Sequence, residues 1–282
     1  MSTPLTDLKI CFAGAGSMAE AIIRGLVETR TTLPEQICVF NRSNQEVLAQ
    51  LQQKYGINTA PAHEEQMEEL SQANIVVLAM KPKDAAAALS SMKEHIHPDT
   101  LIISVIAGFP IRAMQKILNQ KANFVRTMPN TSSSIGYGMT ALCFSENTDV
   151  IKQAQARTLF QAVGQTVIVP EDQIDLVTGI SGSGPAYFYY MMEALIAEGV
   201  AGGLDEATAK QLTMQTILGA AHMVKLTEES PSELRSKITS PGGTTQAALE
   251  ILEERSVAAA LRQAAKRAAE RAHEIELQLF GE

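Results

Sequence analysis

The chain has 282 residues, 45% of them hydrophobic, so it is long enough to bury one large core or two smaller ones. Its formal net charge of −8 argues against a nucleic acid partner, because phosphate backbones are bound by clustered Lys and Arg. The apolar runs are too short to cross a bilayer, and the opening residues lack the basic and apolar regions of a secretory signal. We therefore expect a cytoplasmic protein with no nucleic acid or membrane partner.

The cysteines and histidines predict neither a disulfide nor a metal site. Cys11, Cys38 and Cys143 each lie in an apolar run, and no two of them form a CxxC motif, which is typical of reduced core cysteines. Only His95 and His97 are close in sequence, and no acidic or cysteine cluster accompanies them. We expect no bound metal.

Short apolar segments alternate with helical patterns through the first 170 residues. The expected strands are Leu8–Ala13, Gln36–Phe40, Ile57–Thr59, Ile75–Met80, Leu101–Ile106, Phe124–Arg126, Met139–Phe144 and Thr166–Val169. The main helices expected between them are Ser17–Glu28, Ser43–Lys54, Asp84–His95 and Asn147–Ala162. Several strands are almost entirely Val, Ile and Leu, as in sheets buried on both faces, and the alternation indicates βαβ units. We predict an α/β domain with a mainly parallel sheet over residues 1–170.

The composition changes after Pro170. Strand-like runs stop, and the helix formers Ala, Leu, Met, Glu and Gln dominate. The last segment, Val257–Leu279, is rich in Ala and carries Arg and Lys along its length. We predict an all-helical domain over residues 171–282, with the boundary near Val169–Asp172.

A glycine-rich turn follows the first expected strand. Residues 14–19 read GAGSMA, which matches the GxGxxA pattern of dinucleotide-binding sites, and they open the first expected helix. Gly14 allows the tight turn, Gly16 lets the backbone approach a pyrophosphate, and the helix N-terminus faces the phosphates. A turn without a ligand is the alternative, but the strand–turn–helix context favours a Rossmann-type nucleotide site. Gly14, Gly16, Ser17 and Met18 are the predicted contacts.

The residues after the second expected strand bear on the choice of cofactor. NAD sites usually carry Asp or Glu there, whereas this chain has Asn41, Arg42 and Ser43. Arg42 can form a forked contact with a 2′-phosphate, and its neighbours can donate further hydrogen bonds. The alternative is a solvated Arg42 with Ser43 capping the next helix, although capping and phosphate binding are compatible. We expect NADPH as the preferred cofactor, with NADH possible.

A further cofactor contact is expected after the fourth strand. Met80, Lys81 and Pro82 follow that strand, and in this fold its carboxyl end borders the cofactor. An ordinary surface lysine is the alternative for Lys81. We favour proximity to the site.

Two segments of the helical half are rich in small residues. Residues 179–187 read GISGSGPAY and lead into a long helix, with Ser183 as a candidate cap and glycines that permit close approach by a ligand or backbone. Residues 240–245 read SPGGTT and precede a helix expected over Gln246–Glu254. Backbone N–H groups at a helix N-terminus bind anions, and the absence of a Walker lysine argues against a P-loop. A small carboxylate is the expected ligand.

These segments carry a resemblance to a known family. Residues 179–204, GISGSGPAYFYYMMEALIAEGVAGGL, and 240–254, SPGGTTQAALEILEE, resemble the characteristic segments of pyrroline-5-carboxylate reductases. Residues 125–131, VRTMPNT, resemble that family's MPNT segment near the nicotinamide, and the match runs in order over essentially the whole chain. The resemblance implies NAD(P)H-dependent reduction of 1-pyrroline-5-carboxylate to L-proline, the last step of proline biosynthesis. It also implies a helical dimerisation domain and a homodimer, or a higher homo-oligomer such as a decamer.

The resemblance also implies roles for particular residues. The substrate carboxylate is expected to be held by Ser240, Gly243, Thr244 and Thr245. Thr245 is expected to hydrogen-bond the imine nitrogen as well, and Glu228 to lie near the pyrroline ring from across the dimer. Thr245 and Glu228 are thus the catalytic candidates. Near the nicotinamide the expected residues are Met128, Pro129 and Asn130.

Two other classes of function are open. A β-hydroxyacid-dehydrogenase-like NADP oxidoreductase shares the two-domain plan, but such enzymes carry a Lys on the first long helix of the second domain, and residues 179–203 contain none. A non-catalytic NADP-sensing regulator needs residues 14–19 but has no need of residues 240–245. The reductase is favoured over both.

Overall fold

The computed structural model describes residues 5–119 and 123–281. Its contacts divide the chain into two compact units, one running to Ser183 and resuming at Arg267, the other comprising Gly184–Lys266. The sheet ends at Ile168, near the domain boundary expected at residue 170. The first unit nevertheless continues to Ser183, because the segment after the sheet packs back on it and buries Ile174 in the same core. The assignment of residues 1–170 and 171–282 to separate domains stays a prediction.

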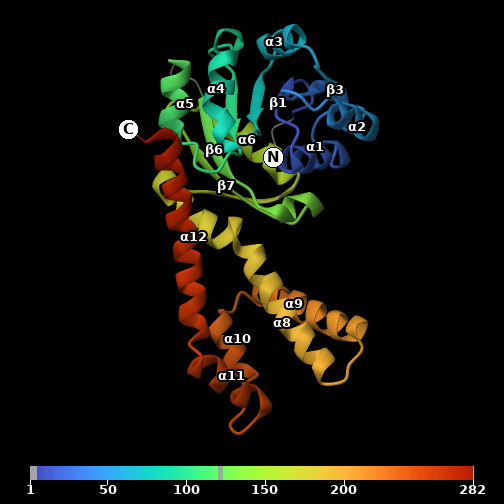
Figure 1. Ribbon diagram of the computed structural model, residues 1–282, viewed down its shortest axis with the longest axis vertical. Helices are drawn as coiled ribbons and strands as arrows, with labels where there is room; N and C mark the ends of the chain where they lie inside the picture. Colours follow the sequence, from blue (N-terminus) through green and yellow to red (C-terminus); the bar gives the residue numbers. More distant parts are fainter. Residues whose placement is uncertain (1–4, 120–122, 282) are drawn as a thin grey trace. The chain divides into compact units, whose positions relative to one another are not determined.

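An eight-stranded sheet forms the centre of the first unit in the described part of the chain, with strand order β3-β2-β1-β4-β5-β6-β7-β8 (Figure 1). The strands are β1 (Ile10–Ala13), β2 (Ile37–Phe40), β3 (Asn58–Thr59), β4 (Ile75–Leu78), β5 (Leu101–Ser104), β6 (Asn123–Met128), β7 (Gly138–Phe144) and β8 (Gly164–Ile168). All neighbouring strands pair in parallel except β6 and β7. The predicted α/β class with a mainly parallel sheet is confirmed, and each expected strand is present.

Helices cover both faces of the sheet and give the first unit three layers (Figure 1). On one face lie α1 (Ser17–Glu28), α2 (Gln45–Tyr55) and α6 (Val150–Gln161), and on the other α3 (His63–Ser71), α4 (Pro82–Met92), α5 (Ile111–Leu118) and α7 (Ile174–Val177). Short helical turns are η1 (Pro34–Gln36), η2 (Lys93–His95), η3 (Thr131–Ile135), η4 (Glu171–Gln173) and the π-helical η5 (Thr178–Gly182). Successive strand residues alternate between the two cores, so strands with apolar residues on both sides are required.

The second unit consists of helices joined by turns. They are α8 (Gly184–Ala201), α9 (Glu206–Thr227), α10 (Pro231–Lys237), α11 (Thr244–Glu254) and the first part of α12 (Val257–Phe280). The helices α8 and α9 approach closely, since a Cβ at Gly199 would lie 3.0 Å from the Cβ of Ala209. The expected all-helical character of this half of the chain is confirmed.

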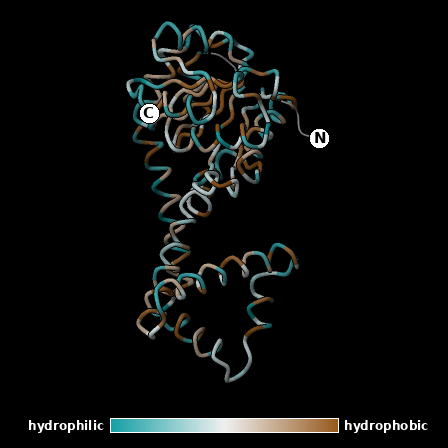
Figure 2. Tube along the Cα trace, turned by 90° about the vertical axis from the view of Figure 1, so that its right-hand side faces the viewer, coloured by the Kyte–Doolittle hydropathy of each residue, from teal (hydrophilic) through white to brown (hydrophobic). Residues whose placement is uncertain are grey.

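Many large apolar side chains of the second unit are exposed. They include Phe188, Tyr189, Tyr190, Leu195, Leu212, Met214, Leu218, Met223, Leu226, Ile238, Ile251 and Leu252. Figure 2 shows hydrophobic residues interspersed along these helices. Within residues 5–119 and 123–281, every helix is too short or too polar to span a bilayer. An apolar surface of this extent is typical of a protein–protein interface.

The last turns of α12 belong to the first unit and pack closely on it. Phe280 stacks on Phe109, with ring centroids 4.6 Å apart. Gly108 lies under the helix with φ of +68°, and a Cβ there would lie 3.1 Å from the backbone nitrogen of Glu276. A larger residue at position 108 would therefore push the helix away from the sheet.

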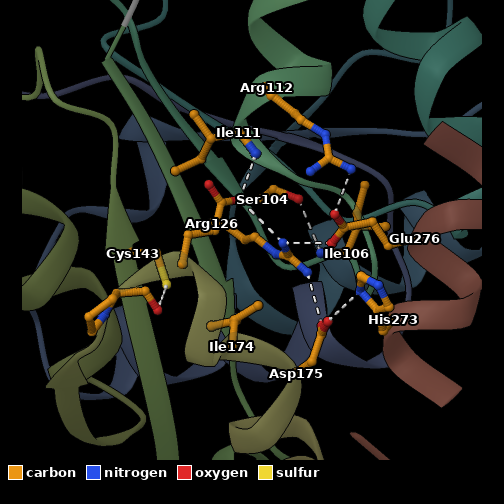
Figure 3. Close-up of polar contacts among 12 residues, drawn as sticks. Ser104, Ile106, Ile111, Arg112, Arg126, Cys143, Ile174, Asp175, His273 and Glu276 are labelled. Atoms are coloured by element: carbon orange, nitrogen blue, oxygen red, sulfur yellow. Dashed lines mark hydrogen bonds and ion pairs between the residues drawn. The ribbon is translucent and has the colours of Figure 1, made fainter. Parts of the chain in front are cut away.

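A buried arginine ties this helix to the sheet (Figure 3). Arg126 lies in β6 with 3% of its side chain exposed, and its guanidinium faces three carboxylates. Its Nη1 lies 2.9 Å from Oε2 of Glu276 and 3.2 Å from Oε1 of Glu171, and its Nη2 lies 3.3 Å from Oδ1 of Asp175. A buried charge is tolerated only with such partners. Arg126 thus joins β6, the η4–α7 segment and α12.

Two further basic side chains complete this cluster. Arg112 lies 2.9 Å from Oε1 of Glu276, and Nδ1 of His273 lies 3.4 Å from Oδ2 of Asp175. Burial raises the pKa of Asp175, and the neighbouring Glu276 raises it further, whereas Arg126 and His273 act in the opposite direction. The charge of Arg126 therefore favours the ionised form of Asp175.

The three cysteines are buried free thiols, as predicted. Burial raises the pKa of Cys143 to about 12. The pKa of Cys38 is raised by its hydrogen bond with Cys11 and then by burial. A thiol with a raised pKa forms little thiolate at neutral pH, so Cys38 and Cys143 are unsuited to nucleophilic chemistry.

Candidate functional site

The glycine-rich turn joins β1 to α1 at the carboxyl end of the sheet. Gly14 has φ of +118°, and a Cβ there would lie 2.5 Å from the carbonyl oxygen of Ala79. Its amide donates to the carbonyl of Phe40 at 2.8 Å, which ties the turn to the end of β2. Gly16 is the N-cap of α1 and offers no side chain to cap it. The first-turn amides of α1 are therefore suited to bind a phosphate group.

A cavity of about 630 Å³ opens beside this turn, and we call it the cofactor groove. It lies where the strand order reverses, since β1 pairs with both β2 and β4. The predicted cofactor residues that line it are Gly14, Gly16, Asn41, Arg42, Ser43, Met80 and Lys81. Those that do not line it are Ser17, Met18, Pro82, Met128, Pro129 and Asn130. The first three of these begin α1 and α4, next to lining residues.

The turn after β2 presents an exposed arginine. The side chain of Arg42 is 85% exposed, and its Nη1 lies 3.4 Å from Oδ1 of Asp84. Asn41 instead holds the turn, because its Oδ1 accepts from the amides of Ser43 at 3.2 Å and Asn44 at 2.9 Å. The cap of α2 is Asn44, which accepts from the amide of Val47, so the capping role considered for Ser43 is wrong.

Six polar residues of the groove were missed by the sequence analysis, two of them Asn44 and Ser91. His63 and Gln66 come from α3, and Lys83 and Asp84 from the first turn of α4. Gln66 donates its side-chain amide to the carbonyl of Ala60 at 3.2 Å, which fixes α3 against the end of the sheet. Each follows a strand whose carboxyl end faces the groove, and that rule is the signal that could have found them.

The predicted nicotinamide segment contacts the glycine-rich segment before α8. Asn130 donates its side-chain amide to the carbonyl and the hydroxyl oxygen of Ser181, each at 3.3 Å. A Cβ at Gly182 would lie 3.4 Å from Sδ of Met128. Residues 128–130 are thus held by the π-helical turn η5, and Ser181 is a contact that the sequence analysis did not identify.

The predicted carboxylate-binding residues lie together at the start of α11. Gly243 is the N-cap, and its amide donates to the carbonyl of Ser240 at 3.0 Å. Thr244 and Thr245 are the first two residues of the helix. Gly242 has φ of +71°, a conformation that glycine adopts at low cost. The loop thereby directs first-turn amides and two hydroxyl-bearing residues to one helix end.

The helix begins two residues earlier than expected. It starts at Thr244 and not at Gln246, so Thr245 lies inside the first turn and does not cap it. Among the described residues, the hydroxyl of Thr245 has no hydrogen-bond partner, whereas the Gln246 side chain accepts from the amide of Gly242 at 2.8 Å. Thr245 is therefore a candidate for contact with a ligand.

Glu228 lies at the C-terminal end of α9, the second helix of the second unit. It is the exposed C-cap of α9 and has φ of +58°, which is uncommon outside glycine. This conformation ends α9 before Ser230 caps α10 through a capping box with Glu233. The expected position of Glu228 beside a pyrroline ring involves a partner subunit and stays a prediction.

The three-layer fold, the GxGxxA turn at the strand reversal and the exposed Arg42 together define a Rossmann-type dinucleotide-binding oxidoreductase. Residues 171–275 match the family model described as pyrroline-5-carboxylate reductase dimerisation, and residues 9–108 match that described as NADP oxidoreductase, coenzyme F420-dependent. The chain belongs to the pyrroline-5-carboxylate reductase family.

Relatives and solved structures agree with this assignment. The chain is 44% identical to pyrroline-5-carboxylate reductase 1 of Bacillus spizizenii over 96% of this chain and 91% of the relative. A reductase structure from Coxiella burnetii matches 95% of this chain and 98% of its own at a TM-score of 0.87 and 37% identity. The Plasmodium falciparum pyrroline carboxylate reductase with NADP bound matches 96% and 98% at a TM-score of 0.86 and 28% identity.

Proposed function

We propose that this protein reduces 1-pyrroline-5-carboxylate to L-proline with NADPH, the last step of proline biosynthesis, with NADH as the alternative hydride donor. The observation that carries the proposal is the start of α11, where Gly243 caps the helix without a side chain and leaves amides and hydroxyls for a small carboxylate. A regulator that only senses NADP has no need of this loop. The family membership favours a reductase over a hydroxyacid dehydrogenase.

The residues of the cofactor groove fit NADPH. At Gly14 a Cβ would collide with the carbonyl of Ala79, so the backbone is left bare where a pyrophosphate has to approach. We assign the 2′-phosphate to Arg42, with Ser43 beside it, and the remaining contacts to Met80 and Lys81. When bound, the reduced nicotinamide supplies the hydride. The chain's own role is to bind and orient the cofactor.

The substrate needs little acid–base help from the protein. A protonated iminium is already electrophilic, so the protein has to hold the carboxylate and orient the C=N bond. We assign the carboxylate to Ser240, Gly243 and Thr244, and the imine nitrogen to the hydroxyl of Thr245. Met128, Pro129 and Asn130 are assigned to the nicotinamide end, and Glu228 to the ring from a partner subunit.

The reaction is tested by following NADPH oxidation at 340 nm with a panel of substrates. We expect 1-pyrroline-5-carboxylate to be turned over much faster than six-membered cyclic imines or any β-hydroxyacid. Because the hydride acceptor is a C=N bond, hydroxyacids with NADP⁺ should give no signal above background. A hydroxyacid that is oxidised faster than the imine is reduced would reject the proposal.

We assign the exposed apolar surface of the second unit to a homodimer, with assembly into a higher oligomer such as a decamer. Light scattering on the purified protein should give at least twice the 30.4 kDa chain mass at micromolar concentration. The reason is that Phe188, Tyr189 and Leu212 are part of an exposed apolar surface, and such surfaces are usually covered by a protein partner. An active monomer at that concentration would rule out this assignment.

A cytoplasmic location is also part of the proposal. The free, buried cysteines suit a reducing compartment, where disulfides rarely persist. The net charge of −8 is unfavourable for binding nucleic acid, so we propose no nucleic acid partner.

A further inference from the structure

We propose that Asp84 sets how strongly the cofactor groove distinguishes NADPH from NADH, by competing with the adenosine 2′-phosphate for Arg42. The inference rests on the proposed role of Arg42. It concerns Asp84, which lies in α4. Loss of the Asp84 charge is expected to tighten NADPH binding, whereas loss of the Arg42 charge is expected to weaken it.

The acid at this end of the groove comes from an unusual place. NAD-specific sites carry an acid at the end of the second strand, where this chain has Asn41 and Arg42. Here the carboxylate is supplied across the groove, from the first turn of α4, and Asp84 lines the cavity together with Arg42. The pair joins two walls of the cavity, with 3.4 Å between Nη1 of Arg42 and Oδ1 of Asp84.

Asp84 is the more firmly placed partner. Its side chain is 33% exposed against 85% for Arg42, and its position in a first helical turn is favourable for an acid. Ion pairs this exposed are weak, so Arg42 can leave Asp84 at small cost. The carboxylate itself stays in the wall of the groove when Arg42 turns to another anion.

A 2′-phosphate bound to Arg42 would lie close to the carboxylate of Asp84. A phosphate oxygen bound to Arg42 lies about 2.8 Å from the guanidinium nitrogen. With Arg42 in its present position, an oxygen bound to Nη1 is at most about 6 Å from Oδ1 of Asp84, which is shorter than the screening length of physiological salt. A phosphate monoester carries between one and two negative charges at neutral pH, so its repulsion by Asp84 opposes NADPH. NADH has a hydroxyl there and is not repelled.

Other charges in the groove favour the phosphate. Lys81 and Lys83 also line the cavity, and Asp84 is the acid among its lining residues. The groove is thus cationic overall and suited to NADPH, while Asp84 reduces the advantage of the phosphate. This arrangement is expected to leave NADH binding usable.

The test is calorimetric titration of the full-length protein with NADPH, NADH and 2′,5′-ADP, without imine substrate. Asp84→Asn keeps the shape of the side chain and should tighten NADPH and 2′,5′-ADP by roughly three- to tenfold, with less than a twofold change for NADH. The gain should shrink when salt is raised. Glu28→Gln, at the far end of α1, removes one negative charge outside the groove. It should leave the affinities for all three ligands unchanged.

A double-mutant cycle separates the inference from the role of Arg42. Arg42→Gln alone should weaken NADPH and leave NADH nearly unchanged, and this reports only on Arg42. In the Arg42→Gln background, Asp84→Asn should tighten NADPH binding much less than it does in the parent protein. Equal tightening of NADPH and NADH, an undiminished gain without Arg42, or weaker NADPH binding in Asp84→Asn would each overturn the proposal.

Discussion

Replacing Arg126 by Met is expected to lower the free energy of unfolding by about 3–5 kcal/mol, the usual cost of removing one member of a buried ion cluster. The side chain is 3% exposed and faces three carboxylates, of which Glu276 is 6% exposed. Met preserves much of the apolar stem but leaves the acids without their shared cation. The measurement is urea unfolding followed by far-ultraviolet circular dichroism at constant protein concentration.

The effect of pH identifies the cause of this destabilisation. Without Arg126 the pKa of Asp175, which burial already raises, is expected to rise further. A carboxyl whose pKa is higher in the folded than in the unfolded protein favours folding at low pH, and this benefit is lost as pH rises through the folded value. The loss caused by Arg126→Met should therefore be larger at pH 8 than at pH 5.

Arg271→Met is the matched control for the same substitution. Arg271 pairs with Glu274 on the exposed side of α12, where its side chain is 50% exposed. Solvent screens such a pair, so its loss should change stability far less. If Arg126→Met and Arg271→Met are equally stable at every pH, the buried cluster does not hold the end of α12.

The sheet could be predicted because each of its strands is recognisable from a short apolar segment of the sequence. Buried parallel strands need apolar residues on both faces, and segments such as Ile75–Leu78 supply them without interruption. The end of β6, residues 127–128, was missed because Thr127 interrupts the apolar pattern. Thr127 is buried all the same, since its hydroxyl donates to the carbonyl of Ser104 at 2.9 Å. Such long-range partners are invisible to a local pattern.

Two helices of the first unit were also absent from the main expected set. The α3 sequence, HEEQMEELS, has only two buried residues, Met67 and Leu70, so its apolar stripe is thin. The α5 helix, Ile111–Leu118, has eight residues, which is too short for a clear periodic signal. Packing on the sheet, and not helix propensity, decides both.

The cofactor groove was predicted in part. Residues with a turn or glycine motif, such as Gly14 and Arg42, were found because the mechanism fixes their spacing. His63 and Asp84 follow no motif, and they reach the groove only through the order of the strands. A single sequence fixes that order weakly, so residues placed by topology escape a local reading.

Thr245→Ala is expected to reduce turnover of 1-pyrroline-5-carboxylate by roughly ten- to a hundredfold, the effect of losing one oriented hydrogen bond at the reacting atom. NADPH affinity should remain nearly unchanged, because Thr245 is not among the residues that line the cofactor groove. In the proposed function the hydroxyl contacts the imine nitrogen, where charge is lost during hydride transfer, so the loss should show mainly in kcat. Steady-state kinetics and NADPH titration provide the two measurements.

Two variants at the same position separate catalysis from helix stability. Thr245→Ser retains the hydroxyl and should keep most of the activity, whereas Thr245→Val retains the branched shape and should be as slow as Ala. Since Gly243 is the N-cap and α11 already begins at Thr244, loss of the Thr245 hydroxyl removes no cap, and thermal stability should hardly change. If Ala, Val and Ser variants all match the parent in kcat, Thr245 has no part in the reaction. The substrate site must then be sought elsewhere.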